Sequence, residues 1–175
     1  MLFKATKIEG AWIVDLQRNS DERGYFARAW CTEEFEDHGI NPKLCQLNLS
    51  YSSKRGTLRG MHYQIDPHSE MKAVRCVKGA LFDVIIDLRP ESNTYKQWFG
   101  FELNERNKSM LILPEGCAHG FLTLQDDSEA FYLVSAAYNQ ESERGLRWDD
   151  PSFNIKWPFH PIEVSSKDSS WKNYE

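Results

Sequence analysis

Short apolar segments, each bounded by turn-forming residues, recur along the chain from residue 44 onward. In residues 81–88 the apolar side chains at even positions share one face of an expected strand, while Asp83 and Asp87 fall on the other face. Further strands are expected over residues 73–77, 110–113, 120–124 and 130–134, with Lys78-Gly79 as a hairpin turn and 125–128 as a polar turn. So many short strands, with little helix between them, predict an all-β chain built as a sandwich or barrel.

One helix is expected near the start of the chain, over residues 32–38. Thr32 can cap its first turn, two glutamates follow where the helix dipole favours acidic groups, and Gly39 can end it. The tail from residue 149 contains three prolines and is expected to be ordered coil with short turns. Because no low-complexity linker or internal repeat divides the sequence, we expect residues 1–175 to form a single domain.

Composition and charge narrow the class of protein further. A net charge of −5 argues against a general nucleic-acid binder, which would carry a basic stripe. The four cysteines, Cys31, Cys45, Cys76 and Cys117, form no C-x-x-C pair and match no zinc-binding spacing, so reduced thiols are expected. No stretch has the length and apolarity of a membrane span, and the first residues lack a secretory signal. A cytoplasmic protein that binds no membrane is therefore expected.

Arg59 and His62 are the first candidates for site chemistry. An arginine can bind a phosphate with parallel hydrogen bonds, and a histidine can act as a base near neutral pH. Their positions differ by three, so a regular strand would send the two side chains to opposite faces unless Gly60 carries a β-bulge. On spacing alone, the pair is equally well explained as a core histidine beside a surface arginine.

Lys72 precedes an expected strand and would share a face with Val74 and Cys76. A lysine on an inward face is costly to bury unless it meets an anion, so an inward Lys72 indicates a ligand or a developing negative charge. The alternative is a lysine on an edge strand, where it discourages aggregation. The sequence alone leaves both explanations open.

His119 and Tyr132 complete the candidates found from the residues themselves. Glycines on both sides of His119 indicate a tight backbone path near a ligand. Tyr132 shares a strand face with Ala130 and Val134, where a core ring is the commoner role and a catalytic acid the alternative.

Several other kinds of site are not expected. Metal sites in β-barrels favour two neighbouring histidines in a strand with a carboxylate, but Gln64 occupies the position two residues after His62. The sequence also contains no P-loop, no G-x-G-x-x-G turn and no nucleophile elbow. Metal catalysis, nicotinamide chemistry and covalent hydrolysis are therefore not expected.

Several motifs, in this order along the chain, resemble those of the dTDP-4-dehydrorhamnose 3,5-epimerase family, which acts on nucleotide-linked 4-keto-6-deoxy sugars. They lie at residues 21–26 (DERGYF), 58–64 (LRGMHYQ), 82–84 with 87–89 (FDV and DLR), 114–121 (PEGCAHGF), 147–151 (RWDDP) and 166–168 (SKD). The likeness covers nearly the whole chain. It implies a cupin-like jelly roll with a few short helices that forms a homodimer and uses no metal and no cofactor.

The resemblance also implies roles for individual residues. His62 is similar to the family's general base, with Asp168 as its dyad partner. Lys72 matches the group that stabilises negative charge on the C4 oxygen of the sugar, and Tyr132 matches the acid that returns a proton from the opposite face. The positions that match substrate contacts are Arg23, Gln46, Asn48, Arg59, His119, Glu143 and Lys167, and those that match rings packed against the nucleotide base are Phe26 and Tyr138. In the family, Arg23 and Phe26 reach into the pocket of the neighbouring subunit.

One departure from the family pattern bears on the nucleotide, because Arg28 stands where the family usually has a glutamate. Thymine and uracil present an N–H donor at ring position 3, whereas cytosine presents an acceptor there, which suits an arginine. If Arg28 contacts the base edge, we expect a looser base preference or a preference for CDP-linked sugars. The alternative is that Arg28 turns to a phosphate or to solvent.

The leading hypothesis is an epimerase that inverts C3, C5 or both in a nucleotide-diphosphate-linked 4-keto-6-deoxyhexose. The alternatives are the same chemistry on a CDP-linked sugar, a 3,4-ketoisomerase on a similar scaffold, a silent sugar-nucleotide binding module, and a metal-dependent cupin oxygenase. Retention of His62, Lys72, Tyr132 and Asp168 favours epimerisation, and Gln64 argues against the oxygenase.

Overall fold

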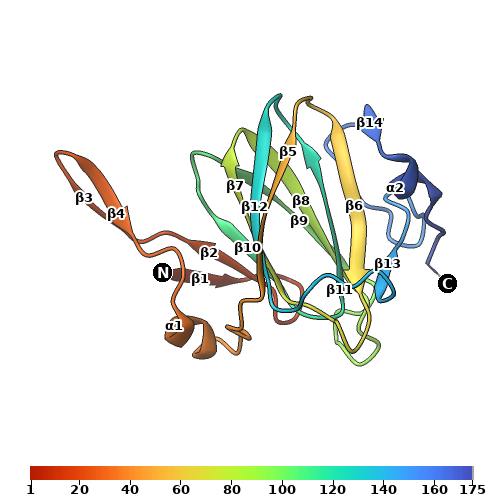
Figure 1. The fold of residues 1–175 in the computed structure, drawn as a ribbon, viewed down its shortest axis with the longest axis horizontal. Helices are drawn as coiled ribbons and strands as arrows, with labels where there is room; N and C mark the ends of the chain where they lie inside the picture. The colour runs from red at the N-terminus through yellow and green to blue at the C-terminus, as the bar shows by residue number, and fades with distance from the viewer. Residues whose placement is uncertain (175) are drawn as a thin grey trace.

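The computed structural model describes residues 1–174, and residue 175, the last of the expected domain, lies outside the described residues. Within them, two sheets of mostly antiparallel strands face each other (Figure 1). The first has the order β1 (Leu2–Ala5), β2 (Trp12–Asp15), β10 (Met110–Leu113), β7 (Lys72–Lys78), β12 (Ser128–Val134), β5 (Gln46–Ser52). The second has the order β13 (Glu143–Gly145), β6 (Thr57–Gln64), β11 (Cys117–Thr123), β8 (Ala80–Asp87), β9 (Trp98–Asn104), and β14 (Glu163–Val164) pairs in parallel with β6. The expected all-β class is confirmed.

Strand residues that point between the two sheets form the main core. Leu81 and Ile85 of β8, Leu111 of β10 and Val74 of β7 are fully buried there. Full burial of one such aliphatic side chain stabilises a fold by about 1.5–3 kcal/mol. Asp83 lies between Leu81 and Ile85 on the same inward face of β8. It is also fully buried, so its carboxylate must find hydrogen-bond partners inside the protein.

Both sheets are also covered on their outer faces. On the first sheet, Phe35 of α1 (Thr32–Glu36) packs with Met110 of β10. On the second sheet, Val84 and Ile86 pack with Phe153 of the C-terminal tail. An antiparallel sheet commonly leaves one face in water. Here the tail covers that face, which explains why the even positions of residues 81–88 are apolar.

The turn at Lys78-Gly79 is not a hairpin, contrary to the expectation from sequence. The strands that it joins, β7 and β8, belong to different sheets. Gly79 has φ of +72° and carries the chain across from one sheet to the other. Turn-forming residues indicate that the chain reverses direction. They do not determine which strands pair, because pairing depends on contacts between residues distant in sequence.

The helices also differ from the expectation. α1 is shorter than residues 32–38, and its N-cap is Cys31, without a side-chain cap bond, so Thr32 does not cap it. The tail is more regular than ordered coil, because it contains β14 and α2 (Ser166–Ser170), in which the N-cap Ser165 accepts the backbone N–H of Asp168 at 3.0 Å. Across residues 1–174, no helix is long and apolar enough to cross a membrane.

Gly60 carries the irregularity in β6 that would bring Arg59 and His62 to one face. In the pairing of β6 with β11, His62 lies opposite His119 and Arg59 lies opposite Phe121. The interval is three residues along β6 but two along β11, so β6 contains one extra residue there, as in a β-bulge. Gly60 has φ of +130°, a conformation that favours glycine. The β-bulge hypothesis is confirmed, and Arg59 and His62 line the same cavity.

We expect Gly60→Ala to destabilise the fold strongly. An added Cβ would lie 2.5 Å from the Cα of Gly120 and 2.9 Å from the carbonyl oxygen of His119, which are backbone atoms that cannot turn away. Overpacking of this kind costs about 1–3 kcal/mol, and the positive φ adds strain. Urea unfolding measures the loss, with Gly24→Ala as the matched control, since Gly24 has φ of +133° and nothing within 4 Å of its added Cβ. Equal losses of unfolding free energy in the two variants would contradict this expectation.

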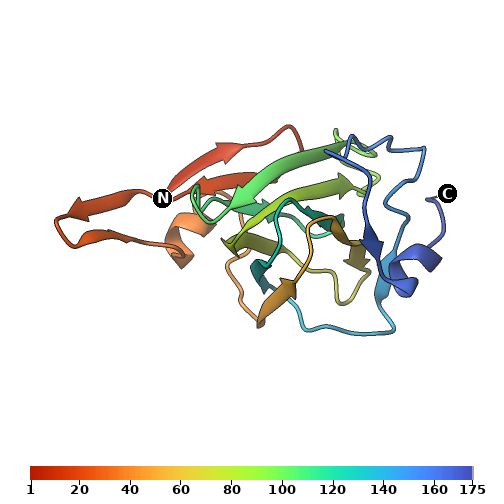
Figure 2. The same ribbon diagram turned by 90° about the horizontal axis from the view of Figure 1, so that it is seen from above.

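The strands β3 (Arg18–Asp21) and β4 (Gly24–Ala27) form a separate two-stranded hairpin that projects from the two sheets (Figure 1). Figure 2 shows the same projection from above. Phe26 is 74% exposed, and the side chain of Arg23 is 85% exposed. Because an isolated two-stranded hairpin is at best marginally stable in water, this projection is a candidate for contacts with another molecule.

Candidate active site

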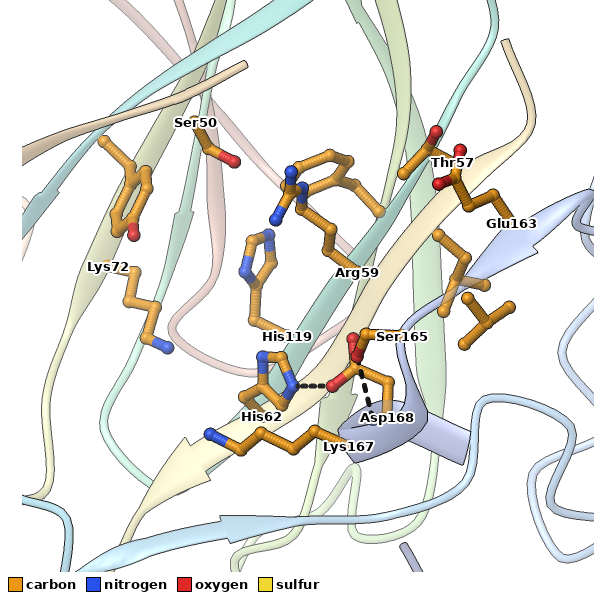
Figure 3. A pocket seen from close by; sticks show the side chains of 14 residues that line it. Ser50, Thr57, Arg59, His62, Lys72, His119, Glu163, Ser165, Lys167 and Asp168 are labelled. Atoms are coloured by element: carbon orange, nitrogen blue, oxygen red, sulfur yellow. Dashed lines mark hydrogen bonds and ion pairs between the residues drawn. The ribbon is translucent and has the colours of Figure 1, made fainter. Parts of the chain in front are cut away.

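A cavity of about 440 Å³, called the main cavity here, lies between the two sheets beside α2 (Figure 3). A smaller space of about 200 Å³, called the side hollow, adjoins it, and His62, Lys72 and Tyr132 line both. The expected site residues in the main cavity are Arg59, His62, Lys72, His119, Tyr132, Lys167 and Asp168, and those in the side hollow also include Gln46, Asn48, Tyr138 and Glu143. Most candidates from the sequence thus surround one connected space.

His62 and Asp168 form a short polar pair in the main cavity, drawn as a dashed line in Figure 3. The Nε2 atom of His62 lies 2.6 Å from Oδ1 of Asp168, and Oδ2 accepts the backbone N–H of Gly60 at 3.2 Å. Burial opposes the charge of Asp168, but the hydrogen bonds and the charge of His62 outweigh it and lower the pKa of the carboxyl. Because a carboxylate only accepts, Nε2 carries the hydrogen, and Nδ1 of a neutral ring is left to take a proton.

We expect Asp168→Asn to flatten the acid side of the stability-versus-pH curve. An unfolded aspartate titrates near pH ~3.9, whereas the pKa of Asp168 in the fold is lower. Its ionised form therefore stabilises the fold above that pH, and the contribution is lost as the pH falls through the folded pKa. At neutral pH the variant should lose about 1–3 kcal/mol of unfolding free energy, since His62 and Gly60 lose a charged acceptor.

Urea unfolding over a pH series measures this effect. Asp21→Asn is the control, because Asp21 belongs to an exposed ion pair with Arg23, and exposed pairs contribute little. If the stabilities of the parent and Asp168→Asn fall in parallel between about pH 5 and pH 3, the assignment of that acid loss to Asp168 is wrong.

Lys72 points into the main cavity from β7, which lies between β10 and β12 in the interior of its sheet (Figure 3). The edge-strand explanation for Lys72 is therefore wrong. Its Nζ lies 3.0 Å from Oε1 of Glu70, and the two side chains are only 12% and 9% exposed. Sequence reasoning misses Glu70, although a spacing of two residues places both side chains on one face of an extended segment.

Tyr132 reaches the main cavity from β12, on the sheet that faces the strand of His62. Its ring packs against the main core. Burial and the negative charge of Glu70 raise the pKa of the Tyr132 hydroxyl, and the positive charge of Arg59 partly offsets this effect. The phenol is therefore protonated at neutral pH. One wall of the cavity offers a group that can accept a proton, and the facing wall offers one that can donate a proton.

Hydrogen bonds to neighbouring residues fix the side chains of His119 and Arg59 in the main cavity. The Nε2 atom of His119 lies 2.9 and 3.0 Å from the two carboxylate oxygens of the fully buried Asp83. Arg59 donates from Nε to the hydroxyl of Ser52 at 3.2 Å and from Nη2 to the carbonyl oxygen of Tyr51 at 3.0 Å. Asp83 is a second residue missed as part of the site. An aspartate within an apolar strand indicated a buried polar contact. The sequence could not identify its partner, because His119 belongs to another strand, β11.

A chain of polar contacts borders the side hollow. The Nζ of Lys167 lies 2.6 and 2.7 Å from the carboxylate oxygens of Glu143, and the Tyr138 hydroxyl donates to the same carboxylate at 2.9 Å. Burial opposes the charge of Glu143, but the bonds from Lys167 and Tyr138 outweigh it and lower the pKa of this carboxyl. The backbone N–H of Tyr138 donates to Oε1 of Gln46 at 2.7 Å. Tyr138 is 56% exposed, so its ring remains open beside this chain.

Three expected substrate contacts lie away from both spaces. Arg23 and Phe26 are on the projecting hairpin, where Arg23 pairs with Asp21 at 2.6 Å. Arg28 follows the hairpin and lies 3.1 Å from Glu34. None of the three lines the main cavity or the side hollow. Within one chain these residues do not share a site with the cavity, so their expected roles require a second subunit.

Each histidine of the main cavity pairs with one carboxylate. His62 pairs with Asp168, and His119 pairs with Asp83. Over residues 1–174, no group of three or more His, Cys, Asp or Glu side chains is placed so that it could hold a metal ion.

Comparison with known proteins matches this chain to one family. Residues 5–175 match the family model described as dTDP-4-dehydrorhamnose 3,5-epimerase. A curated protein with that name from Sinorhizobium fredii (strain NBRC 101917 / NGR234) is 42% identical over 171 residues, which cover 97% of this chain and 88% of that protein. Identity at this level over nearly the full length confirms the resemblance found in the motifs.

Solved structures extend the match to the tertiary fold. The dTDP-4-dehydrorhamnose 3,5-epimerase of Elizabethkingia anophelis NUHP1 has a TM-score of 0.96 and 34% identity, covering 99% of this chain and 96% of that one. The dTDP-6-deoxy-D-glucose-3,5-epimerase of Legionella pneumophila Philadelphia 1, solved in complex with dTDP-4-keto-L-rhamnose, has a TM-score of 0.91 and 34% identity, covering 98% and 92%. The expected cupin-like jelly roll is confirmed. This chain belongs to the dTDP-4-dehydrorhamnose 3,5-epimerase family.

Proposed function

We propose that this chain is an isomerase of deoxysugar biosynthesis that epimerises a nucleotide-diphosphate-linked 4-keto-6-deoxyhexose at C3, C5 or both. The observation that carries the proposal is the placement of His62 and Tyr132 on facing sheets of one cavity, with Lys72 also lining it. Inversion of a carbon centre needs a base on one face and an acid on the other. The relative solved with dTDP-4-keto-L-rhamnose supports the substrate class.

The first step is removal of a proton beside the C4 carbonyl. The carbonyl acidifies the C–H bonds at C3 and C5, because the electron pair left by proton loss moves onto the C4 oxygen. Neutral His62 takes the proton at Nδ1, and the carboxylate of Asp168 holds the ring and stabilises its charged form. A positioned base typically contributes about 10²–10⁴-fold to the rate.

Lys72 stabilises the enolate that forms in this step. Its ammonium lies in a nearly dry part of the cavity, 12% exposed, where a charge acts more strongly on a neighbouring oxyanion than it would in water. Since Glu70 already holds the ammonium at 3.0 Å, little reorganisation is needed when the negative charge develops.

Tyr132 completes the inversion from the opposite face. Its phenolic O–H bond breaks, a new C–H bond forms on the face away from His62, and the electron pair on the enolate oxygen returns to the C4 carbonyl. The tyrosinate and the histidinium then return to their starting forms by proton exchange with water. The carbon that loses a hydrogen to His62 thus gains one from Tyr132 with inverted configuration.

The remaining donors of the cavity fit the diphosphate and nucleotide. Arg59 and Lys167 are the donors that we assign to phosphate oxygens, for which arginine is well suited, and His119, whose Nε2–H is held by Asp83, is assigned to contact the substrate through Nδ1. The compared relatives carry dTDP in their names, which supports dTDP as the nucleotide. The CDP alternative requires Arg28 to turn from Glu34, 3.1 Å away, toward a nucleotide base.

We further propose a homodimer in which the β3–β4 hairpin of one subunit completes the pocket of its partner. Arg23 and Phe26 are exposed and cannot serve the pocket of their own chain. β5 forms the edge of the first sheet, and its outward residues Leu47, Leu49 and Tyr51 are 59%, 64% and 51% exposed. An exposed apolar row on an edge strand is a ready surface for pairing with another chain.

Mixing two inactive variants should restore activity if the pocket is shared. Arg23→Ala keeps its own His62, and His62→Asn supplies an intact Arg23 to the partner. In an equal mixture half of the dimers are mixed and each carries one complete site, so about a quarter of the parental activity should return. Activity assays after subunit exchange, with sedimentation to establish the dimer, make the measurement. No recovery in verified mixed dimers would show that each chain builds its whole site.

We also propose that the enzyme works in the reducing environment of the cytoplasm. All four cysteines are free. Burial raises the pKa of the Cys76 thiol to about 11 and that of Cys117 to about 12. Thiols of such high pKa are unreactive, which suits a structural role for both cysteines.

Deuterium uptake in D₂O tests the proposed reaction. The protein is incubated with dTDP-4-keto-6-deoxyglucose and, separately, with its CDP counterpart, and the sugars are weighed by mass spectrometry. Two deuterons indicate exchange at both C3 and C5, and one indicates a single centre. Uptake only with the CDP sugar would favour the Arg28 hypothesis. Conversion without inversion to a 3-keto product would identify a ketoisomerase, and no reaction with either sugar would overturn the proposal.

A further inference from the structure

Glu70 is a charged residue of the pocket that takes no direct part in the proton transfers proposed above. It lies just before β7, lines the side hollow, and has a side chain that is only 9% exposed. A carboxylate with so little hydration is stable only when it is paired. Its two oxygens have different partners, because Oε1 lies 3.0 Å from Nζ of Lys72 and Oε2 accepts Nε2 of Gln64 at 3.1 Å.

Gln64 fixes the position of the Glu70 carboxylate. Gln64 is 4% exposed, and its Nε2 also lies within hydrogen-bond distance of the carbonyl oxygens of His68 at 2.9 Å and Ala137 at 3.2 Å, so its two hydrogens are shared among three acceptors. Its Oε1 accepts the backbone N–H of Asn139 at 2.6 Å. Gln64 cannot turn away without breaking these bonds. The carboxylate is thus held from β6 while it faces the ammonium of Lys72 on β7.

This arrangement gives Glu70 a function that rests on the epimerase reaction proposed above. We propose that Glu70 is a positioning residue: its carboxylate, oriented by Gln64, holds the Lys72 ammonium at the cavity wall that Tyr132 shares. Lys72 can then meet the enolate oxygen without first being ordered. The negative charge of Glu70 also raises the pKa of Tyr132, so the phenol stays protonated until it donates to the carbanion.

The charges around Tyr132 decide the direction of the effect. The charged and titratable side chains that share the cavity walls with its phenol are Arg59, His62, Lys72, His119, Glu163, Lys167 and Asp168 in the main cavity, and Tyr63, Glu70, Tyr138 and Glu143 in the side hollow. Burial raises the pKa of Tyr132, Glu70 raises it further, and Arg59 lowers it. Without the Glu70 charge, one effect that raises the pKa of Tyr132 is lost, while the effect of Arg59 that lowers this pKa remains. Tyr132 should then ionise at a lower pH, and the basic limb of the pH–rate profile should move in the same direction.

The competing explanation is that Glu70 is only a structural partner for a buried lysine. Under that explanation, Glu70→Gln changes the free energy of unfolding and leaves the titration of Tyr132 and the pH–rate profile unchanged. Glutamine has nearly the same shape and can still bond to Gln64, so this variant removes the charge with little change of volume.

A titration without substrate separates the two explanations. The ultraviolet absorption of tyrosinate is followed against pH in the parent and in Glu70→Gln, each with and without Tyr132→Phe, so that the difference reports Tyr132 alone. We expect Tyr132 to titrate lower by roughly one pH unit in Glu70→Gln, the size of shift that one nearby charge produces. Equal titration in both backgrounds would overturn the proposal. Because no substrate is used, this result stands even if the chain epimerises no nucleotide sugar.

Kinetics of the active enzyme supply the second measurement. We expect Glu70→Gln to lower kcat about tenfold, with KM changed less than about twofold, since the lost preorganisation acts in the transition state. Glu70→Asp keeps the charge and should restore the basic limb of the profile. Asp15→Asn, which removes a carboxylate 2.6 Å from Lys4 outside the cavity, is the control and should leave both unchanged. An active parent whose kcat and pH profile survive Glu70→Gln would also overturn the proposal.

Discussion

His62→Asn is expected to lower the rate of epimerisation by about 10²–10⁴-fold, the usual contribution of a positioned general base. Asparagine is polar and smaller than histidine, but it cannot take a proton at neutral pH. Without a base, neither C3 nor C5 can lose its hydrogen, so deuterium uptake from D₂O should fall by the same factor as product formation. Mass spectrometry of the recovered sugar nucleotide measures both quantities in one reaction.

The matched control for this variant is His160→Asn. His160 lies in the tail with its ring 5.4 Å from that of Trp148, and it lines neither the main cavity nor the side hollow. It should keep parental exchange and turnover. The binding of free dTDP to His62→Asn should also stay near the parental level, since His62 is assigned to proton transfer. Retention of exchange in a folded His62→Asn would show that another group removes the proton.

Tyr132→Phe is expected to separate exchange from inversion. His62 can still remove a proton, exchange it with D₂O and return a deuteron to the same face. The variant should therefore accumulate labelled sugar of unchanged configuration, while formation of the inverted product falls by about 10²–10⁴-fold. Mass spectrometry reports the label, and proton NMR coupling constants report the configuration at C3 and C5.

Tyr63→Phe is the matched control for this second variant. Tyr63 is also a partly buried tyrosine that lines the side hollow, and burial raises the pKa of its hydroxyl. Tyr63 does not line the main cavity, and no proton transfer is assigned to it, so inversion should continue at nearly the parental rate. An equal loss of exchange and inversion in Tyr132→Phe would assign Tyr132 to substrate binding instead of proton return.

The local predictions from sequence succeeded where neighbouring residues carry the information. Residues 110–113 form a strand with the expected bounds, and the bulge required to bring Arg59 and His62 together lies at Gly60. Alternation of side chains along a strand is a property of adjacent residues, so it can be read without knowledge of the fold. The family motifs likewise occupy continuous stretches of the sequence.

The predictions failed where the outcome depends on partners distant in sequence. Lys78-Gly79 has the composition of a hairpin turn, yet the strands on its two sides join different sheets. Lys72 could have stood on an edge strand, and only its neighbours β10 and β12 show that it is interior. Strand pairing is decided by which faces can be buried together, and residues far apart in the chain supply those faces.

By itself, the sequence of this protein determined the strand-rich class, the family and most of the side chains that surround the cavity. Only the tertiary structure decided that His62 and Tyr132 occupy facing walls, that Glu70 holds Lys72, and that the hairpin with Arg23 stands outside its own pocket. The physical reason is that a motif specifies which groups are present. Charges and proton donors act over distances of a few ångströms, and packing of the two sheets sets those distances.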